Sequence, residues 1–187
     1  MSQIIDVVTS LEEEIGRRGV SNRDTTEILN VNLELPNVNS DIEEEGTVRV
    51  WYDSRYGAGQ FADKCSQEAH HYQYLKYGLF SKLDYNRFYF KEGPKFSRKL
   101  VMHSEDCISL VQILPREGRE MMLTAYMRSS DIKRLLPVDL LGLVEIGNNV
   151  IGAIYDPYED PNFAGVKLNM QVYIGSAHIY LEGSSPR

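Results

Sequence analysis

The stretch LTAYMRSSDIKRLLPVDLLGL, from Leu123 to Leu143, combines a strand pattern, a turn and an apolar run. Its first half alternates apolar and polar residues as a β-strand does, and the polar sequence Ser129-Ser130-Asp131 is typical of a turn that caps a helix. The apolar run that begins at Leu140 predicts a buried helix. Arg128 and Ser129 at the strand end can donate together to an oxyanion such as phosphate, although a surface arginine at a helix cap would give the same pattern.

The sequences on either side of this stretch show helix and strand patterns in turn. Helices are expected over Ile4 to Ile15 and Phe61 to Phe80, and a polar loop over Asn37 to Gly46. Strands are expected over Ile28 to Leu35, with a break near Asn30, at the start of Thr47 to Tyr56, and in KLVMHSED (99–106), CISLVQIL (107–114), EMMLTAYM (120–127) and KLNMQVYIGSAHIYL (167–181). The pattern predicts an α+β fold in a single domain over residues 1–187, with an antiparallel or mixed sheet and helices on one face.

Composition narrows the possible settings of the protein. The chain has 187 residues and a net charge of −7, which argues against general nucleic-acid binding because such binding needs a basic surface. No apolar run approaches the roughly 20 residues that span a bilayer, and the N-terminus lacks the charge-then-apolar order of a signal peptide. Two cysteines are too few for a secreted disulfide scaffold. We therefore expect a cytoplasmic protein with free thiols and no membrane partner.

Two further sites could carry chemistry. Cys107 begins an apolar strand, where it could be a nucleophile if nearby arginines lower its pKa, or simply a small buried hydrophobic residue. His178 and Tyr180 are two residues apart on a predicted strand and therefore point to the same side. They could bind one ligand group together, or they could belong to a half-exposed strand face.

The histidines and cysteines could also form a metal site. The candidate ligands are Cys65, His70, His71, His103 and Cys107. Their spacings fit no compact zinc knuckle, and the spacing from Cys65 to His70 on a predicted helix is poor for pairing with a second ligand pair. We expect no metal.

Four motifs resemble those of the thymidylate synthase family. Tyr126-Met127-Arg128-Ser129-Ser130-Asp131 followed by Leu136-Pro137-Val138-Asp139 resembles the family signature Y-Q-R-S-x-D-x-x-x-G-L-P-F-N. Gly175 to Tyr180, GSAHIY, resembles its G-D-x-H-I-Y, and Cys107 to Gln112 resembles its C-H-x-x-x-Q strand. Asn22-Arg23-Asp24-Thr25 resembles its N-terminal arginine loop. The four motifs keep the family order from Arg23 to Tyr180.

The resemblance implies a fold and a reaction. The implied fold is a mixed sheet packed with helices, with one sheet face used to form a homodimer. The implied reaction begins when the thiolate of Cys107 adds to C6 of a pyrimidine nucleoside monophosphate. The C5 atom then attacks the one-carbon unit of 5,10-methylenetetrahydrofolate. The resemblance further implies phosphate contacts from Arg23, Arg128, Ser129 and Arg98, the last across the dimer, sugar contacts from His178 and Tyr180, and a pterin contact from Asp131.

Asp139 stands where thymidylate synthases have an asparagine that pairs with uracil. A carboxylate can accept from the N4 amine of cytosine, and in its protonated form it can also donate to N3. The same exchange distinguishes the deoxycytidylate hydroxymethylases of the superfamily, so the resemblance implies a cytidine nucleotide, CMP or dCMP. The alternative is that Asp139 is a helix N-cap.

Other departures keep a second class of function open. No histidine follows Cys107, and Glu105-Asp106 precede it, which would raise the pKa of the thiol. The chain also ends shortly after Tyr180, where the family has a C-terminal lid. The first hypothesis is an enzyme that methylates or hydroxymethylates a cytidine monophosphate. The alternative is a catalytically inactive pyrimidine-nucleotide-binding protein on the same scaffold.

Overall fold

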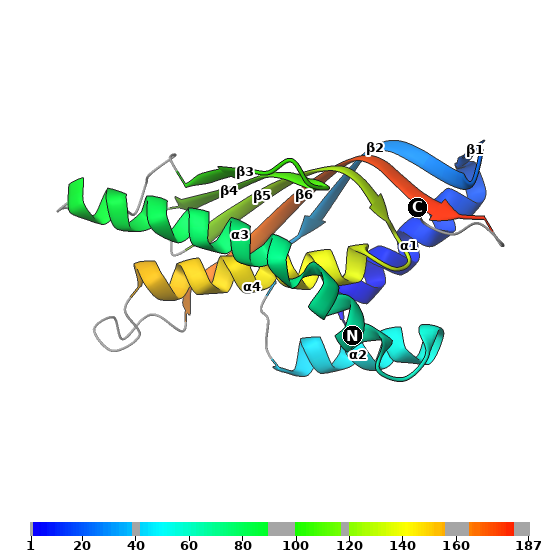
Figure 1. The fold of residues 1–187 in the computed structure, drawn as a ribbon, viewed down its shortest axis with the longest axis horizontal. Helices are drawn as coiled ribbons and strands as arrows, with labels where there is room; N and C mark the ends of the chain where they lie inside the picture. The colour runs from blue at the N-terminus through cyan, green and yellow to red at the C-terminus, as the bar shows by residue number, and fades with distance from the viewer. Residues whose placement is uncertain (1, 39–41, 90–99, 117–119, 156–164, 182–187) are drawn as a thin grey trace.

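A six-stranded sheet forms one layer of the computed structural model, which describes residues 2–38, 42–89, 100–116, 120–155 and 165–181. The strands lie in the order β1-β2-β6-β5-β4-β3 (Figure 1). Within the described residues the strands are β1 Val20–Asn22, β2 Thr25–Leu35, β3 Val101–His103, β4 Ile108–Arg116, β5 Glu120–Asp131 and β6 Lys167–Tyr180, and the helices are α1 Gln3–Arg18, α2 Ile42–Tyr56, α3 Gln60–Tyr89 and α4 Leu136–Ile154.

The sheet is mixed because β5 and β6 run parallel while each other neighbouring pair of described strands is antiparallel. The connection from β5 to β6 passes through α4, which is how parallel strands are usually joined. The expected α+β class with a mixed sheet is therefore confirmed.

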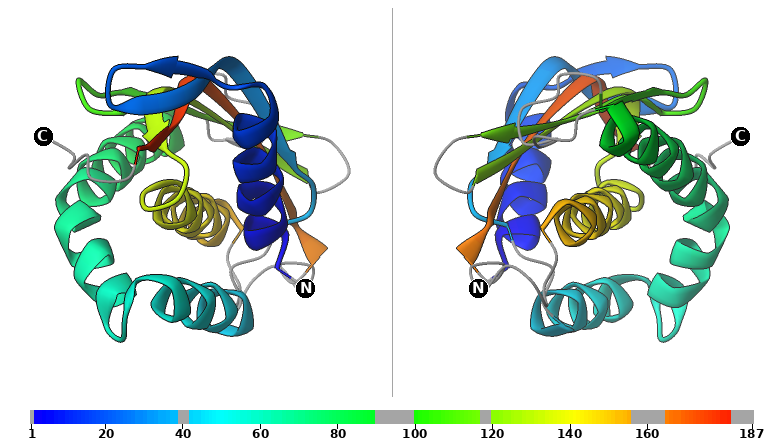
Figure 2. Two further views of the ribbon diagram at one scale, coloured as in Figure 1. Left: turned by 90° about the vertical axis from the view of Figure 1, so that its right-hand side faces the viewer. Right: turned by 90° about the vertical axis from the view of Figure 1, so that its left-hand side faces the viewer.

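All four helices lie on one side of this sheet (Figures 1 and 2). Alternate residues of the central strands are buried beneath them: Leu123, Ala125 and Met127 on β5, and Leu168, Met170, Val172 and Ile174 on β6. Helix α4 is in the middle of the helical layer, and most of its side chains are buried. It thus forms the centre of the hydrophobic core.

Helix α4 is longer and more apolar than the apolar run beginning at Leu140 indicates. It is the one described helix that is long and apolar enough to cross a membrane, with a mean hydropathy of 1.2. However, 61% of the apolar 18-residue stretch of this helix is buried inside the fold, and the helix carries Asp139 and Glu145. Its apolar character is therefore accounted for by its central position among the other helices and the sheet.

Three local predictions were wrong. The polar loop expected over Asn37 to Gly46 is too long, because α2 already begins at Ile42. The segment Thr47 to Tyr56 was expected to start as a strand because of its β-branched and aromatic residues, but it belongs to α2. Val48 and Tyr52 are buried one helical turn apart, and Glu45 and Arg49 form an i,i+4 ion pair, so the helix period is set by packing and charge. The expected turn at Ser129 to Asp131 is also absent, because β5 continues through Asp131.

The predicted break near Asn30 is part of a distortion that crosses four strands. Asn30 has a positive φ of 57°, and it lies between the pairs Leu29↔Ser176 and Val31↔Ile174. Gly175 is opposite it, and a Cβ there would meet the carbonyl oxygen of Arg128 at 2.7 Å, so only glycine fits. The pairing of β4 with β5 shifts between Ile108 and Leu110. The strand ends beyond this line carry most of the predicted site residues.

Candidate functional site

A cavity of about 460 Å³ lies at the ends of β5 and β6. One side, here called the strand-end wall, consists of Cys107, Ser129, Ser130, Asp131, His178 and Tyr180. The opposite side, here called the helical wall, consists of Tyr52, Tyr56, Gln60, Asp63, Lys64 and Gln67. Arg134 and Leu135, in the turn between β5 and α4, complete the lining. The structure thus brings together five residues that the sequence motifs singled out: Cys107, Ser129, Asp131, His178 and Tyr180.

The strand-end wall is positioned by backbone pairing. Asp131 of β5 is opposite His178 of β6 in the parallel register, and Ser129 is opposite Ser176. The rings of His178 and Tyr180 are 5.3 Å apart and nearly perpendicular, at 84°. The predicted common orientation of these two side chains leads both into the same cavity.

A hydrogen bond behind this wall joins β6 to the neighbouring strand. Ser176 Oγ donates to Glu27 on β2, and this bond is the main reason why the pKa of Glu27 is lowered. This bond places the Glu27 carboxylate of β2 beside Ser176 of β6.

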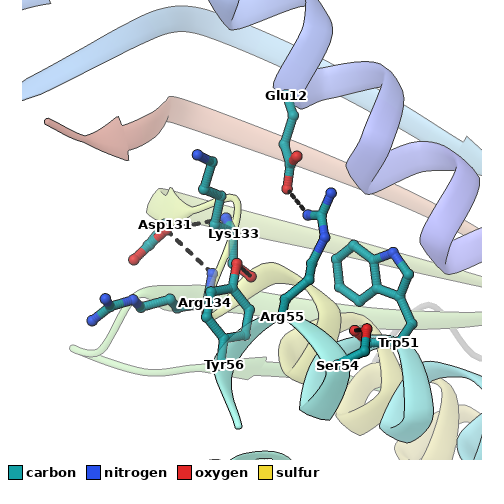
Figure 3. Close-up of polar contacts among 8 residues, drawn as sticks. All are labelled: Glu12, Trp51, Ser54, Arg55, Tyr56, Asp131, Lys133 and Arg134. Atoms are coloured by element: carbon teal, nitrogen blue, oxygen red, sulfur yellow. Dashed lines mark hydrogen bonds and ion pairs between the residues drawn. The ribbon is translucent and has the colours of Figure 1, made fainter. Parts of the chain in front are cut away.

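The β5–α4 turn is held by its own aspartate (Figure 3) and by two tyrosines of α2. Asp131 Oδ1 accepts hydrogen bonds from the backbone N–H groups of Lys133, at 3.1 Å, and Arg134, at 3.3 Å. The Tyr52 hydroxyl donates to the carbonyl of Arg134 and the Tyr56 hydroxyl to that of Lys133, each at 3.1 Å. Burial, followed by the charges of Tyr56 and Asp131, raises the pKa of Tyr52 to about 12, so its hydroxyl keeps its proton.

Helix α2 is in turn held against α1. Arg55 Nη1 lies 2.6 Å from Glu12 Oε1, and the guanidinium carbon is 4.4 Å from the centre of the Trp51 ring (Figure 3). This pairing combines an ion pair with a cation–π contact at the C-terminal end of α2. It fixes the end of the helix from which Tyr56 reaches the turn.

Cys107 is exposed at the start of β4, and its backbone carbonyl accepts from the N–H of Arg128 at 2.8 Å. The preceding Asp106 turns its carboxylate to α3, where Oδ2 is 2.8 Å from His71 Nδ1. Ser104 Oγ donates to the same oxygen at 3.1 Å. The hydrogen bond from His71 and then that from Ser104 lower the pKa of Asp106, so the acid beside the thiol is ionised at neutral pH.

Asp139 is buried in the first turn of α4 and does not line the cavity. Its Oδ1 accepts a hydrogen bond of 2.6 Å from the Tyr72 hydroxyl of α3. Burial raises the pKa of Asp139 to about 7, against the opposing effect of the Tyr72 hydrogen bond. The N-cap position of α4 is Leu135, so the helix-cap alternative for Asp139 is wrong. Asp131 instead accepts from the N–H groups of Lys133 and Arg134 in the turn before α4, and no side chain among the described residues caps this helix.

Two of the three predicted phosphate arginines lie outside the lining of this cavity. Arg23 is an exposed residue between β1 and β2 with a φ of 52°, and Arg128 is exposed on β5. Neither is among the described residues that line the cavity, and Arg98 lies outside the described residues. The cations that do line it are Lys64 and Arg134, together with the carboxylates of Asp63 and Asp131. Sequence reasoning missed Lys64 because nothing in α3 marks one face as a site, and missed Arg134 although it lies inside the central motif.

A second cavity of about 440 Å³ lies between α3 and α4, with mostly apolar surroundings. It holds Cys65, whose thiol pKa is raised mainly by burial, and none of the residues expected at a nucleotide site. Among the described residues, no group of three or more His, Cys, Asp or Glu side chains could hold a metal ion. We therefore place the candidate site in the cavity beside Cys107.

The comparisons with known proteins add no family to this geometry. Neither a scan against protein-family models nor a search of the curated proteins found a match to this chain.

Proposed function

We propose that the cavity beside Cys107 binds a pyrimidine nucleoside monophosphate and that Cys107 is the nucleophile of a C5 one-carbon transfer. The observation that supports this most is the convergence of Cys107, Ser129, Asp131, His178 and Tyr180 on one cavity of about 460 Å³. These residues come from three motifs that are far apart in the sequence. The volume is within the usual range of roughly 300–1,000 Å³ for small-molecule sites.

Each part of the nucleotide has a suitable partner in this proposal. His178 and Tyr180 offer an imidazole and a hydroxyl to the sugar. Ser129, Lys64 and Arg134 offer a hydroxyl and two cations to the phosphate, in place of Arg23 and Arg128, which do not line the cavity. Asp131 is left for the pterin of 5,10-methylenetetrahydrofolate, as the resemblance to thymidylate synthases implies.

In the proposed reaction the Cys107 thiolate forms a bond to C6, and the electron pair of the C5–C6 double bond makes C5 a nucleophile. C5 bonds to the methylene carbon of the folate and loses its proton, and the bond from that carbon to the folate nitrogen breaks. The exocyclic methylene then takes up water with release of a proton, giving a hydroxymethyl group, or it takes hydride from the tetrahydrofolate, which is oxidised to dihydrofolate, giving a methyl group. Expulsion of the thiolate restores the C5–C6 double bond.

Asp139 favours cytosine as the base. With a pKa of about 7, its carboxyl group exists in both forms near neutral pH, so it can accept from N4 and donate to N3. To do so it must exchange its present bond to Tyr72, because it is buried and does not line the cavity. We therefore propose CMP or dCMP as the nucleotide, with rearrangement of Tyr72 as a step of binding.

We also propose that the protein is a cytoplasmic homodimer formed through the sheet face opposite the helices. No described helix covers that face (Figure 1). Tyr126 on β5 is 46% exposed there, and its ring stacks on that of Tyr173 at 4.9 Å. A free-thiol nucleophile also suits a reducing compartment.

Two observations favour the alternative, a nucleotide-binding protein without catalysis. The ionised Asp106 directly precedes Cys107 in the sequence, and the Tyr72 hydroxyl is already hydrogen-bonded to the Asp139 carboxyl group. Calorimetric titration with CMP, dCMP and dUMP tests binding, and release of tritium from the C5 position of each nucleotide, with and without methylenetetrahydrofolate, tests chemistry. We expect tritium release by the natural chain, none by Cys107→Ala, and unchanged release by Cys65→Ala. Binding without release would leave only the alternative, and neither binding nor release would overturn both.

The choice of phosphate ligands has its own test. The ratio of the dissociation constants of cytidine and CMP isolates the contribution of the phosphate. Arg134→Ala and Lys64→Ala should each lower that ratio by roughly tenfold, the value of about one charged hydrogen bond, whereas Arg23→Ala should leave it unchanged. A ratio that falls only for Arg128→Ala would return the phosphate to the arginine of the sequence motif.

A further inference from the structure

The helix α3 reaches the loop before Cys107 through a single described ion pair. His71 Nδ1 is 2.8 Å from Asp106 Oδ2, and the His71 side chain is only 12% exposed, whereas that of Asp106 is 66% exposed. Because an ionised carboxylate can only accept, the proton of this hydrogen bond belongs to His71 Nδ1. A largely buried donor therefore holds the carboxylate of the residue next to the thiol.

The loop that carries Cys107 is also anchored within itself and to β5. Ser104 Oγ donates to Asp106 Oδ2, and the Asp106 N–H donates back to Ser104 Oγ, both at 3.1 Å. On the other side of the thiol residue, the Arg128 N–H donates to the Cys107 carbonyl at 2.8 Å. The contact with His71 is thus the part of this anchoring that faces the helical layer.

The same helix supplies one side of the cavity. Lys64 and Gln67 of α3 belong to the helical wall, and His71 follows Gln67 by one helical turn, on the same side of the helix. The contact between His71 and Asp106 therefore continues this wall to the loop that presents Cys107.

A carboxylate beside a thiol opposes formation of the thiolate, which is the reactive form. The hydrogen bonds from His71 and Ser104 hold the Asp106 carboxylate at α3 and partly offset its charge. We propose that His71 is a positioning residue for Cys107: it acts through Asp106, fixes the loop at the cavity and limits the effect of that carboxylate on the thiol. The inference rests on the proposed role of Cys107, but its test needs no nucleotide.

The two ring nitrogens of His71 differ in a way that defines the conservative variant. Nε2 is buried and has no hydrogen-bond partner among the described residues, so Nδ1 makes the observed contact. The side-chain nitrogen of asparagine occupies nearly the position of Nδ1 and can donate the same bond. His71→Asn should therefore keep the function that His71→Ala loses. The adjacent His70 is exposed on the same helix and provides the matched control.

The test is the alkylation rate of Cys107 by iodoacetamide at constant pH, read by peptide mass spectrometry, which separates Cys107 from Cys65. We expect His71→Ala to lower the alkylation rate of Cys107 roughly threefold to tenfold, which is the effect of one nearby negative charge in a partly screened setting. His71→Asn should stay within about twofold of the natural chain, and His70→Ala should match it.

Asp106→Asn tests the route of the effect. In Asp106→Asn, Cys107 should be alkylated faster than in the natural chain. Adding His71→Ala to this variant should not slow the reaction, because the carboxylate is gone. An unchanged rate in His71→Ala, or equal slowing with and without Asp106, would overturn the inference. Should His71→Ala fail to fold by circular dichroism, His71→Asn and Asp106→Asn decide: slow alkylation by either one contradicts the proposal. Failure of the nucleotide assays alone would leave these rates unaffected.

Discussion

The two walls of the cavity are held in different ways. In the strand-end wall, Ser129 and Asp131 are opposite Ser176 and His178 in a continuous ladder, so many backbone bonds fix each side chain. The helical wall is joined to the β5–α4 turn by the hydroxyls of Tyr52 and Tyr56. The comparison teaches that the residues expected to bind the sugar are on the more constrained wall. The closing of the cavity, in contrast, depends on a few side-chain bonds, each worth about 1 kcal/mol.

The largest expected effect concerns the carboxyl group that joins α3 to α4 behind the helical wall. An aspartate in an unfolded chain ionises near pH 4, whereas the pKa of Asp139 in the folded chain is about 7. Between these values the folded state binds more protons, so stability falls as the pH rises from about 4 to about 7 and then levels off. Asp139→Asn removes this loss and should gain on the order of 4 kcal/mol relative to the natural chain across that window.

Urea unfolding of both chains at pH 4.5 and pH 8 measures this gain. Asp24→Asn, at an exposed carboxyl, is the control and should follow the natural chain. If the free energies of unfolding of Asp139→Asn and the natural chain change by the same amount between pH 4.5 and pH 8, Asp139 does not titrate as a buried acid.

The next prediction tests the packing of β6, the strand that carries part of the strand-end wall. Ile174 of β6 is 1% exposed and is opposite Met127 just before the sheet distortion. Ile174→Ala removes buried side-chain volume and should cost about 2–5 kcal/mol of unfolding free energy. Leu29→Ala, at a side chain that is 64% exposed on β2, should cost well under 1 kcal/mol. Chemical denaturation of the two variants gives both values, and equal costs would contradict the assigned burial.

The smallest effect tests the helical wall. Tyr52→Phe removes the hydroxyl that donates to the Arg134 carbonyl and should cost about 1 kcal/mol. The same variant should weaken nucleotide binding, because Arg134 lines the cavity from the turn that Tyr52 holds. Tyr74→Phe, at an exposed tyrosine of α3, is the matched control. Weakened binding in the control to the same degree would show that the effect does not pass through the turn.

The difference between the walls also explains what could be predicted from the sequence. Strand alternation places His178 and Tyr180 on one side, and the motif around Ser129 and Asp131 is local, so the strand-end wall follows from short-range patterns. The helical wall does not. The β-branched and aromatic residues of Thr47 to Tyr56 favour a strand by propensity, and only their packing against α1 and α3 makes α2 a helix.

The orientation of single side chains was likewise beyond the sequence. Arg128 and Ser129 are neighbours in one motif, yet of these two only Ser129 lines the cavity, and the motif itself does not distinguish them. The contact between His71 and Asp106 joins residues of α3 and the β3–β4 loop, and no spacing rule brings those together. The hydrogen bond between Asp139 and Tyr72 likewise could come only from the packing of α3 on α4.

Hydrogen–deuterium exchange with and without millimolar CMP tests the central claim most directly, because it follows both walls at once. A nucleotide bound in the cavity should slow exchange together in the segments 129–135, 177–180 and 60–67, while residues 4–15 of α1 stay unchanged. Protection of these three segments by CMP, but not by the same concentration of inorganic phosphate alone, is the predicted result. No protection, or protection confined to segments away from Cys107, Ser129 and His178, would contradict the assignment of this cavity as a nucleotide site.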